Sequence, residues 1–179
     1  GKAYSVWHRY AVLTQAQVRG FGFQGNEFAR VPHPAPFRSS ADFGGGIVSE
    51  PYVNGEVRVT TLERALVDVL DAPDLGGGWE EIWRSLELVE YFDLEAVVGH
   101  ALALGSALTT ARVGLFLEQH RERLFVEDAH LARLQRHAPR QPRYLDVTRE
   151  AGRLVKPWNL VVPERVLQAT WEEPGDDLA

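Results

Sequence analysis

The feature that most constrains the fold of this chain is a change in the spacing of its apolar residues at Thr60. Before Thr60, apolar residues stand in short runs that are broken by glycine and proline, a pattern typical of strands and turns. After Thr60, apolar residues recur every three or four positions, as in amphipathic helices. Strands followed by helices predict an α+β domain, in which a short, mostly antiparallel sheet is covered on one face by about five helices.

Two hairpins are predicted in the N-terminal third, because two pairs of strand-like runs are each separated by a turn sequence that contains glycine. One late strand is predicted at 158–162, where apolar residues follow a proline. The first hairpin joins 18–23 to 27–31 through Gly25-Asn26, and the second joins 47–52 to 56–59 through Asn54-Gly55.

The first helix is predicted to begin at Thr60, because Thr60 and Glu63 have the spacing of a capping box. In that motif the threonine oxygen accepts a hydrogen bond from a backbone amide, and the glutamate accepts one from the amide of the capping residue. Pro73 and the glycines at 76–78 end this helix. Later helices are predicted at 79–90, 93–104, 107–124 and 128–137, with a short one from Pro163 to about Gln168.

Two charged residues stand inside the otherwise apolar pattern of the first helix. Arg64 and Asp68 are four residues apart, so their side chains meet on one helix face. An exposed pair of this kind stabilises a helix by only about 0.3–0.5 kcal/mol. A buried pair would instead fix the helix against a polar partner, and the sequence leaves both interpretations open.

Composition restricts the chemistry and the compartment. The 179 residues include no cysteine, which excludes disulfides, thiolate zinc sites and cysteine nucleophiles and fits a reducing compartment. The apolar runs are shorter than the ~20 residues that span a bilayer, and no charged-then-apolar leader opens the chain. We therefore expect a soluble, cytoplasmic protein with no membrane partner. The chain opens with Gly1-Lys2-Ala3 and lacks an initiator methionine, so we interpret Gly1 as a tag remnant or the start of a fragment.

No motif predicts a catalytic site, a cofactor or a metal ion. Residues 20–25 match the G-x-G-x-x-G pattern of pyrophosphate-binding loops, but a turn and a Pro-rich segment follow where such a loop needs a helix. The six histidines form no H-E-x-x-H pair, and no G-x-S-x-G nucleophile elbow is present. A nuclease core would need a lysine beside metal-binding carboxylates, yet Lys156 follows Leu154. These observations predict a protein that is not an enzyme.

Charge is segregated along the chain, whose net charge is −6. Residues 1–40 hold five basic residues against Glu27, whereas residues 60–95 hold ten acidic residues against two arginines. Residues 133–153 hold six arginines against Asp146 and Glu150. Because non-specific nucleic-acid binding needs clustered cations, a chain this acidic would bind phosphates only through a local basic face.

The best candidate for such a face is a series of arginines that are spaced three, four and three residues apart. On a helix and its exit, this spacing forms a short basic ridge able to contact phosphates or an acidic protein surface. The alternative is a solvated helix end, whose cations interact favourably with the helix dipole. The four residues are Arg133, Arg136, Arg140 and Arg143.

Four segments carry a resemblance to a known family. They are 57–70 (VRVTTLERALVDVL), 77–81 (GGWEE), 111–119 (ARVGLFLEQ) and 158–163 (WNLVVP). In order and spacing they resemble the C-terminal domain of AbiEi-type antitoxins, which are transcriptional regulators of type IV toxin–antitoxin systems. The likeness covers roughly residues 56–170, and residues 1–55 match only loosely.

The resemblance implies an antitoxin that counteracts a nucleotidyltransferase-like toxin. In the whole family protein it also implies an N-terminal winged helix that binds the promoter of the operon. Residues 1–55 lack a helix-turn-helix with a basic recognition helix, so promoter DNA is expected as a partner only if the full protein carries a winged helix. We interpret 1–55 as a strand-rich part that ends a truncated N-terminal region, 56–170 as the AbiEi-like domain and 171–179 as an acidic disordered tail.

The leading hypothesis is a non-enzymatic antitoxin or regulatory domain of a bacterial abortive-infection system, acting through macromolecular contacts. The matched motifs are expected to serve as caps, core and packing aromatics, so no catalytic residue is carried over. Two alternatives stay open. A DNA-binding transcriptional regulator would bind its promoter in a salt-sensitive way. A degenerate nuclease-like enzyme would have a deep pocket lined by carboxylates with perturbed pKa values.

Overall fold

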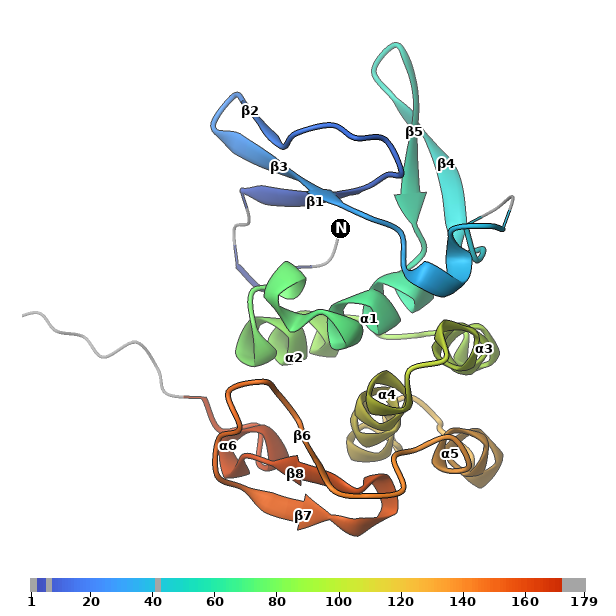
Figure 1. Ribbon diagram of the computed structural model, residues 1–179, viewed down its shortest axis with the longest axis vertical. Coiled ribbons are helices and arrows are strands. Elements are labelled where there is room, and N and C mark those ends of the chain that lie inside the picture. The colour runs from blue at the N-terminus through green and yellow to red at the C-terminus, as the bar shows by residue number, and fades with distance from the viewer. Residues whose placement is uncertain (1–2, 6–7, 41–42, 172–179) are drawn as a thin grey trace, which may run out of the picture.

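The computed structural model describes residues 3–5, 8–40 and 43–171, in which three small sheets surround a layer of helices (Figure 1). Two N-terminal sheets lie on one side of the helices, and a C-terminal sheet lies on the other side (Figure 1). The predicted α+β class is confirmed. The interpretations of Gly1 and of the tail beyond Trp171 fall outside the described residues.

The first sheet is mixed and has the strand order β1-β3-β2. Strand β1 (Arg9–Leu13), which was not predicted, runs parallel to β3 (Asn26–Val31), whereas β2 (Phe21–Phe23) runs antiparallel to β3. The β2–β3 hairpin is confirmed, with its turn one residue earlier than expected. Both residues between the strands, Gln24 and Gly25, have positive φ, and the glycine adopts such a conformation without steric cost.

The second sheet is the predicted hairpin of β4 (Ile47–Tyr52) and β5 (Gly55–Thr60). Its two-residue turn is Val53-Asn54, again one position before the expected pair. A short 3-10 helix, η1 (Ala35–Phe37), lies in the connection between the two sheets.

Six α-helices follow in the described part of the chain, and the five long ones match the predicted positions. Helix α4 ends at Gln119 instead of 124, because residues 120–125 form turns and Phe125 has a positive φ of 55°. The helices are α1 (Leu62–Asp71), α2 (Trp79–Glu87), α3 (Leu94–Leu104), α4 (Ala107–Gln119), α5 (Asp128–Gln135) and the short α6 (Glu164–Leu167), with a 3-10 turn η2 (Pro73–Gly76) between α1 and α2.

The C-terminal sheet contains the predicted late strand and two strands that were not predicted. The late strand is β8 (Leu160–Val162), and Trp158 belongs to the preceding 3-10 turn η3 (Lys156–Trp158). Strand β8 lies between β6 (Arg143–Tyr144) and β7 (Arg153–Val155). Because β6 and β7 are only two and three residues long, they show no alternation that a sequence pattern could reveal.

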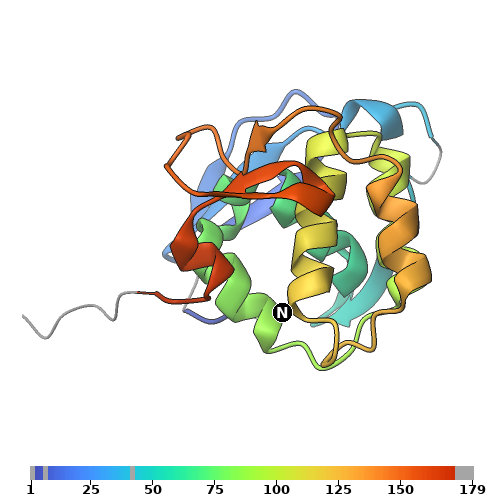
Figure 2. The ribbon, with the colours of Figure 1, turned by 90° about the horizontal axis from the view of Figure 1, so that it is seen from below.

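The core lies inside the helical layer and between that layer and the C-terminal sheet. Helix α1 packs against α3 and α4. Helix α4 also packs against α5, which lies beside it in the view from below (Figure 2). Fully buried side chains come from α1, α2, α4 and β8, among them Leu66, Trp83, Phe116 and Leu160. No helix in the described residues is long and apolar enough to cross a membrane.

Candidate functional site

The start of α1 is capped by Thr61, one residue after the predicted position. The hydroxyl oxygen of Thr61 accepts a hydrogen bond from the backbone amide of Arg64 at 3.3 Å. Thr60 instead ends β5, where it pairs with Ile47, and Glu63 accepts a hydrogen bond from the amide of Asp93 at 3.2 Å. The predicted capping box of Thr60 and Glu63 is therefore wrong, because strand pairing extends through Thr60.

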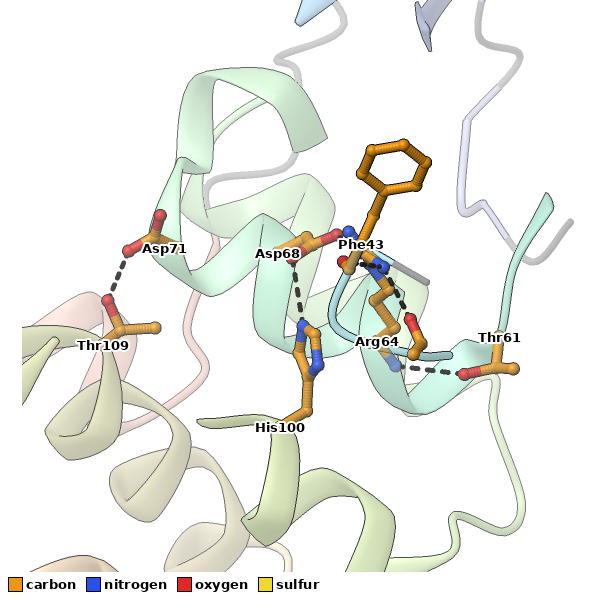
Figure 3. A network of polar contacts seen from close by, with 8 residues as sticks. Phe43, Thr61, Arg64, Asp68, Asp71, His100 and Thr109 are labelled. Carbon is orange, nitrogen blue, oxygen red and sulfur yellow. Dashed lines mark hydrogen bonds and ion pairs between the residues drawn. The ribbon is translucent and has the colours of Figure 1, made fainter. Parts of the chain in front are cut away.

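Arg64 is buried and joins α1 to the segment before β4. Its side chain is 1% exposed, and its Nη1 donates to the carbonyl oxygens of Phe43 at 3.0 Å and Gly45 at 2.6 Å (Figure 3). Its Nε donates to Asp68 Oδ2 at 3.2 Å. Of the two interpretations of this pair, the structure shows the buried one. The carbonyl of Gly46, whose φ is +61°, accepts from the amide of Thr61, so the whole 43–46 segment is held on α1.

Asp68 and Asp71 connect α1 to the helices below it (Figure 3). The second carboxylate oxygen of Asp68 lies 3.5 Å from Nε2 of His100 on α3. The hydroxyl of Thr109 on α4 donates to Asp71. These contacts explain why acidic residues stand on an apolar helix: they fix the packing of α1 on α3 and α4.

Arg112 on α4 is a second buried arginine with a structural role. Its Nε and Nη2 donate to the carbonyl of Leu145 at 2.9 and 2.6 Å, and its Nη1 donates to the carbonyls of Leu70 and Asp71 at 2.9 and 3.0 Å. The guanidinium also lies 5.1 Å from the ring centre of Trp79. Burial lowers the pKa of Arg112, although a guanidinium stays charged at neutral pH. It therefore places a positive charge on the last carbonyls of α1, where the helix dipole is negative.

Two of the resembling segments meet where α4 contacts η3. Glu118 accepts a hydrogen bond from Nε1 of Trp158 at 2.7 Å. Gln119 accepts from Nε1 of Trp83 at 3.2 Å and donates to the carbonyl of Val166. The ring of Trp158 lies directly on Gly114, so there is no space for a Cβ at that position. These contacts tie the end of α4 to two tryptophan rings and to α6, although Glu118 stays partly buried and Gln119 exposed.

The described residues show no cluster of metal-binding side chains. They contain no group of three or more histidine, aspartate or glutamate side chains placed to hold a metal ion. The G-x-G-x-x-G run at 20–25 leads through the β2–β3 turn into a strand, so it lacks the helix N-terminus that binds pyrophosphate. Gly78 does precede α2, but Glu80 and Glu81 in the first turn would repel a phosphate.

Of the four arginines in the predicted ridge, one pairs with a carboxylate and three are exposed. Arg133 donates to Glu95 at 2.5 Å, and this hydrogen bond lowers the pKa of the Glu95 carboxyl. Arg136 follows α5 as its C-terminal cap, whereas Arg140 and Arg143 line a hollow beside the first residues of α4. The last three are exposed, and none of them forms an ion pair with another described residue.

Sequence reasoning missed Arg112 and the Glu118–Trp158 pair. Arg112 carried a usable signal, because it is a charged residue among apolar neighbours from Ala111 to Leu117. The partners of Arg112 gave no signal in the sequence, because they are backbone carbonyls from α1 and from residue 145. Comparisons with protein-family models, with curated proteins and with solved structures find no match to this chain.

Proposed function

We propose that this chain is a non-enzymatic antitoxin or regulatory domain of a bacterial toxin–antitoxin system, acting through contacts with macromolecules. The support from sequence is the order of four segments that resemble AbiEi-type antitoxins. The support from structure is the use of the polar residues in those segments. Arg64 and Arg112 are buried and donate to backbone carbonyls, and the partly buried Glu118 accepts a hydrogen bond from Trp158, so each makes a contact that maintains the fold.

The proposal that the domain acts through contacts with macromolecules rests on its exposed arginines. Three arginines follow one another along the chain from the end of α5, namely Arg136, Arg140 and Arg143. Their side chains face solvent and have no carboxylate partner among the described residues. The segment that bears them is well fixed. The side-chain amide of Asn159 donates to the carbonyl of Pro139 at 2.7 Å, and the amide of Arg143 donates to the carbonyl of Asn159 at 2.8 Å. Exposed guanidinium groups on a backbone that is fixed at Pro139 and Arg143 suit an acidic protein surface or a phosphate backbone.

The partner that we propose is a nucleotidyltransferase-like toxin encoded beside the gene for this chain. Co-expression in bacteria tests it through growth. The unaltered chain should restore growth that the toxin stops, and replacement of Arg136, Arg140 and Arg143 by glutamate should abolish the rescue without changing the thermal midpoint. A control with the same change of charge replaces three exposed arginines of the N-terminal third, Arg9, Arg19 and Arg38, by glutamate and should keep the rescue.

The same assay separates the proposal from a DNA-binding regulator. A regulator that acts only on DNA would leave the toxin active. Its promoter affinity would instead fall steeply with salt, because each phosphate contact releases counterions. Rescue by the triple glutamate variant, or failure of the unaltered chain to rescue, would contradict the proposed role of this surface.

A further inference from the structure

Strand β2 displays two phenylalanines on one face of the first sheet and a glycine on the other. Strand alternation places Phe21 and Phe23 on the same side of the sheet and Gly22 on the opposite side. Both rings lie in solvent, with exposed fractions of 58% and 60%. The glycine-rich run at 20–25, which lacks the helix needed to bind pyrophosphate, therefore presents two aromatic rings to solvent.

A stack of three aromatic rings crosses this sheet from one edge to the other. Phe28 on β3 is paired with Tyr10 of β1 on one side and with Phe21 of β2 on the other side. The ring centres of Tyr10 and Phe28 are 5.3 Å apart, those of Phe21 and Phe28 are 4.8 Å apart, and the ring planes are nearly parallel. Strands β1 and β2 are the outer strands of the sheet, so each end of the stack stands at an edge. We call Tyr10, Phe21, Phe23 and Phe28 the aromatic face.

The opposite face of the sheet is the one that meets the helices. Ala11, Leu13 and Val31 alternate with the residues of the aromatic face along β1 and β3. These three residues line a hollow together with Ala65 and Val69 of α1. The aromatic face is thus left to solvent, and contiguous apolar patches of this kind mark interaction sites.

The charge around the aromatic face is positive, although the chain is acidic overall. Residues 1–40 hold five basic residues against one acidic residue. By strand alternation Arg30 lies on the same side of β3 as the aromatic face, and its Nε donates to the carbonyl of Ala16 at 2.8 Å. Arg19 directly precedes the run at 20–25 and is exposed. Glu27 pairs with Arg9, so neither Arg19 nor Arg30 forms an ion pair with another described residue. Cations beside exposed aromatic rings suit an anionic ligand that itself carries aromatic groups.

The order of residues in β2 matches the start of a motif found in RNA-binding sheets. That motif begins K/R-G-F/Y-G/A-F, and its aromatic residues stack on bases. Residues 19–23, which read Arg-Gly-Phe-Gly-Phe, match all five of these positions. The motif then continues along its strand, whereas Gln24 and Gly25 form the turn to β3, and the sheet has three strands where RNA-recognition sheets have four. The likeness therefore concerns the stacking strand and not the fold.

We propose that the aromatic face binds single-stranded nucleic acid, with bases stacked on Phe21 and Phe23 and phosphates beside Arg19 and Arg30. A single strand can turn the flat faces of its bases toward aromatic side chains, whereas the bases of a duplex are stacked on one another. Such stacking tolerates any base, so the site recognises a single strand and not a sequence. The site lies on other elements than the arginines at 136–143 and does not depend on the antitoxin assignment.

Fluorescence anisotropy with the full chain and a labelled oligouridine at low salt tests the proposal. The chain should bind oligouridine and oligothymidine, and it should bind a DNA duplex of the same length about ten-fold more weakly or less. Tighter binding of oligouridine assigns the site to RNA and tighter binding of oligothymidine assigns it to single-stranded DNA, and both results support stacking on the aromatic face. No binding of either strand, or a duplex bound as tightly as the single strands, overturns the proposal.

Substitutions on the aromatic face give the sharper test. Phe23→Ala should weaken the binding of oligouridine by about five-fold or more, which is the loss expected for one stacked base. Phe21→Ala should act in the same way, and Phe23→Ala decides if breaking the ring stack prevents folding. The matched control is Phe125→Ala, which removes an aromatic ring that is 84% exposed in the turn after α4 and should keep the affinity. Unchanged binding by Phe23→Ala, or an equal loss with Phe125→Ala, contradicts the proposed site.

Charge substitutions separate this site from the arginines that follow α5. Arg19→Gln should reduce the slope of log affinity against log salt by about 0.7, as expected for one phosphate contact with a single strand. Replacement of Arg136, Arg140 and Arg143 by glutamine should leave the affinity for oligouridine and its salt dependence unchanged. The reverse result, with an effect of the three later arginines and none of Arg19, places binding on the other surface and overturns the proposal.

Discussion

Replacing Gly114 by alanine sets two effects of opposite sign against each other. In a helix interior, alanine is more favourable than glycine by about 1 kcal/mol. At Gly114, however, the new Cβ would lie 2.6 Å from Cε3 of Trp158 and closer still to two other atoms of the same ring. Trp158 is fully buried and donates to Glu118, so it cannot move aside without loss.

The unfavourable effect should be the larger one. Overpacking of a core costs about 1–3 kcal/mol. Loss of the hydrogen bond to an ionised Glu118 adds about 1.5–3 kcal/mol. After subtraction of the helix-propensity gain, we expect Gly114→Ala to lower the free energy of unfolding by about 1.5–5 kcal/mol, which corresponds to a fall in the thermal midpoint of roughly 3 °C or more.

The matched control is Gly99→Ala on α3, where no atom lies within 4 Å of the added Cβ. This substitution should raise stability by about 0.5–1 kcal/mol, because only the propensity gain operates. Both variants can be measured by urea unfolding followed by circular dichroism. If Gly114→Ala proves as stable as Gly99→Ala, the close packing of Trp158 on α4 is refuted.

Two further predictions concern the helix cap and one surface ion pair. Thr61→Ala should destabilise the protein by about 1 kcal/mol through loss of the cap, and Thr60→Ala should have a smaller effect. If urea unfolding shows the larger loss of stability for Thr60→Ala, Thr60 and not Thr61 is the cap of α1. The pKa of Glu95 is lowered by its hydrogen bond from Arg133, so this interaction stabilises the fold above the ordinary carboxyl pKa of 4.5 and is lost as the pH falls through the lower, folded-state pKa. Arg133→Gln should move the Glu95 pKa back toward that ordinary value in a carboxyl NMR titration, and an unchanged value would show that the pair does not form in solution.

Patterns of local spacing predicted most of the helices and both hairpins, because their signals lie within a few residues. The helices predicted at 93–104 and 107–124 begin directly after Asp93 and Ser106, whose side chains accept amide hydrogen bonds as N-caps. Glycine-containing turns located the two hairpins to within one residue.

Long-range pairing explains what the sequence could not predict. Thr60 has the local features of a cap, but its pairing with Ile47 on the adjacent strand assigns it to β5 and passes the cap to Thr61. Strand β1 pairs in parallel with β3, and such pairs leave no turn signal between them. For the same reason the sequence did not predict the two strands beside the late strand β8. Strands β6 and β7 are defined only by their pairing with β8.

The candidate site was predicted in part. The spacing of Arg64 and Asp68 indicated a pair, yet whether it was buried depended on the 43–46 segment, which comes from before β4. In the arginine series, Arg133 pairs at the surface with Glu95 of α3, while the other three arginines are exposed and form no ion pair with a described residue. A one-dimensional pattern cannot reveal which cation meets a carboxylate from another helix.

The central claim is that the polar residues of the resembling segments maintain the fold and take no part in chemistry. Growth rescue by Glu118→Gln tests it most directly, since the amide oxygen of glutamine can still accept the hydrogen bond from Trp158 while the negative charge is removed. If the account holds, this variant folds and restores growth against the toxin as well as the unaltered chain does. A variant that is folded, with an unchanged circular dichroism spectrum, but fails to restore growth would contradict it.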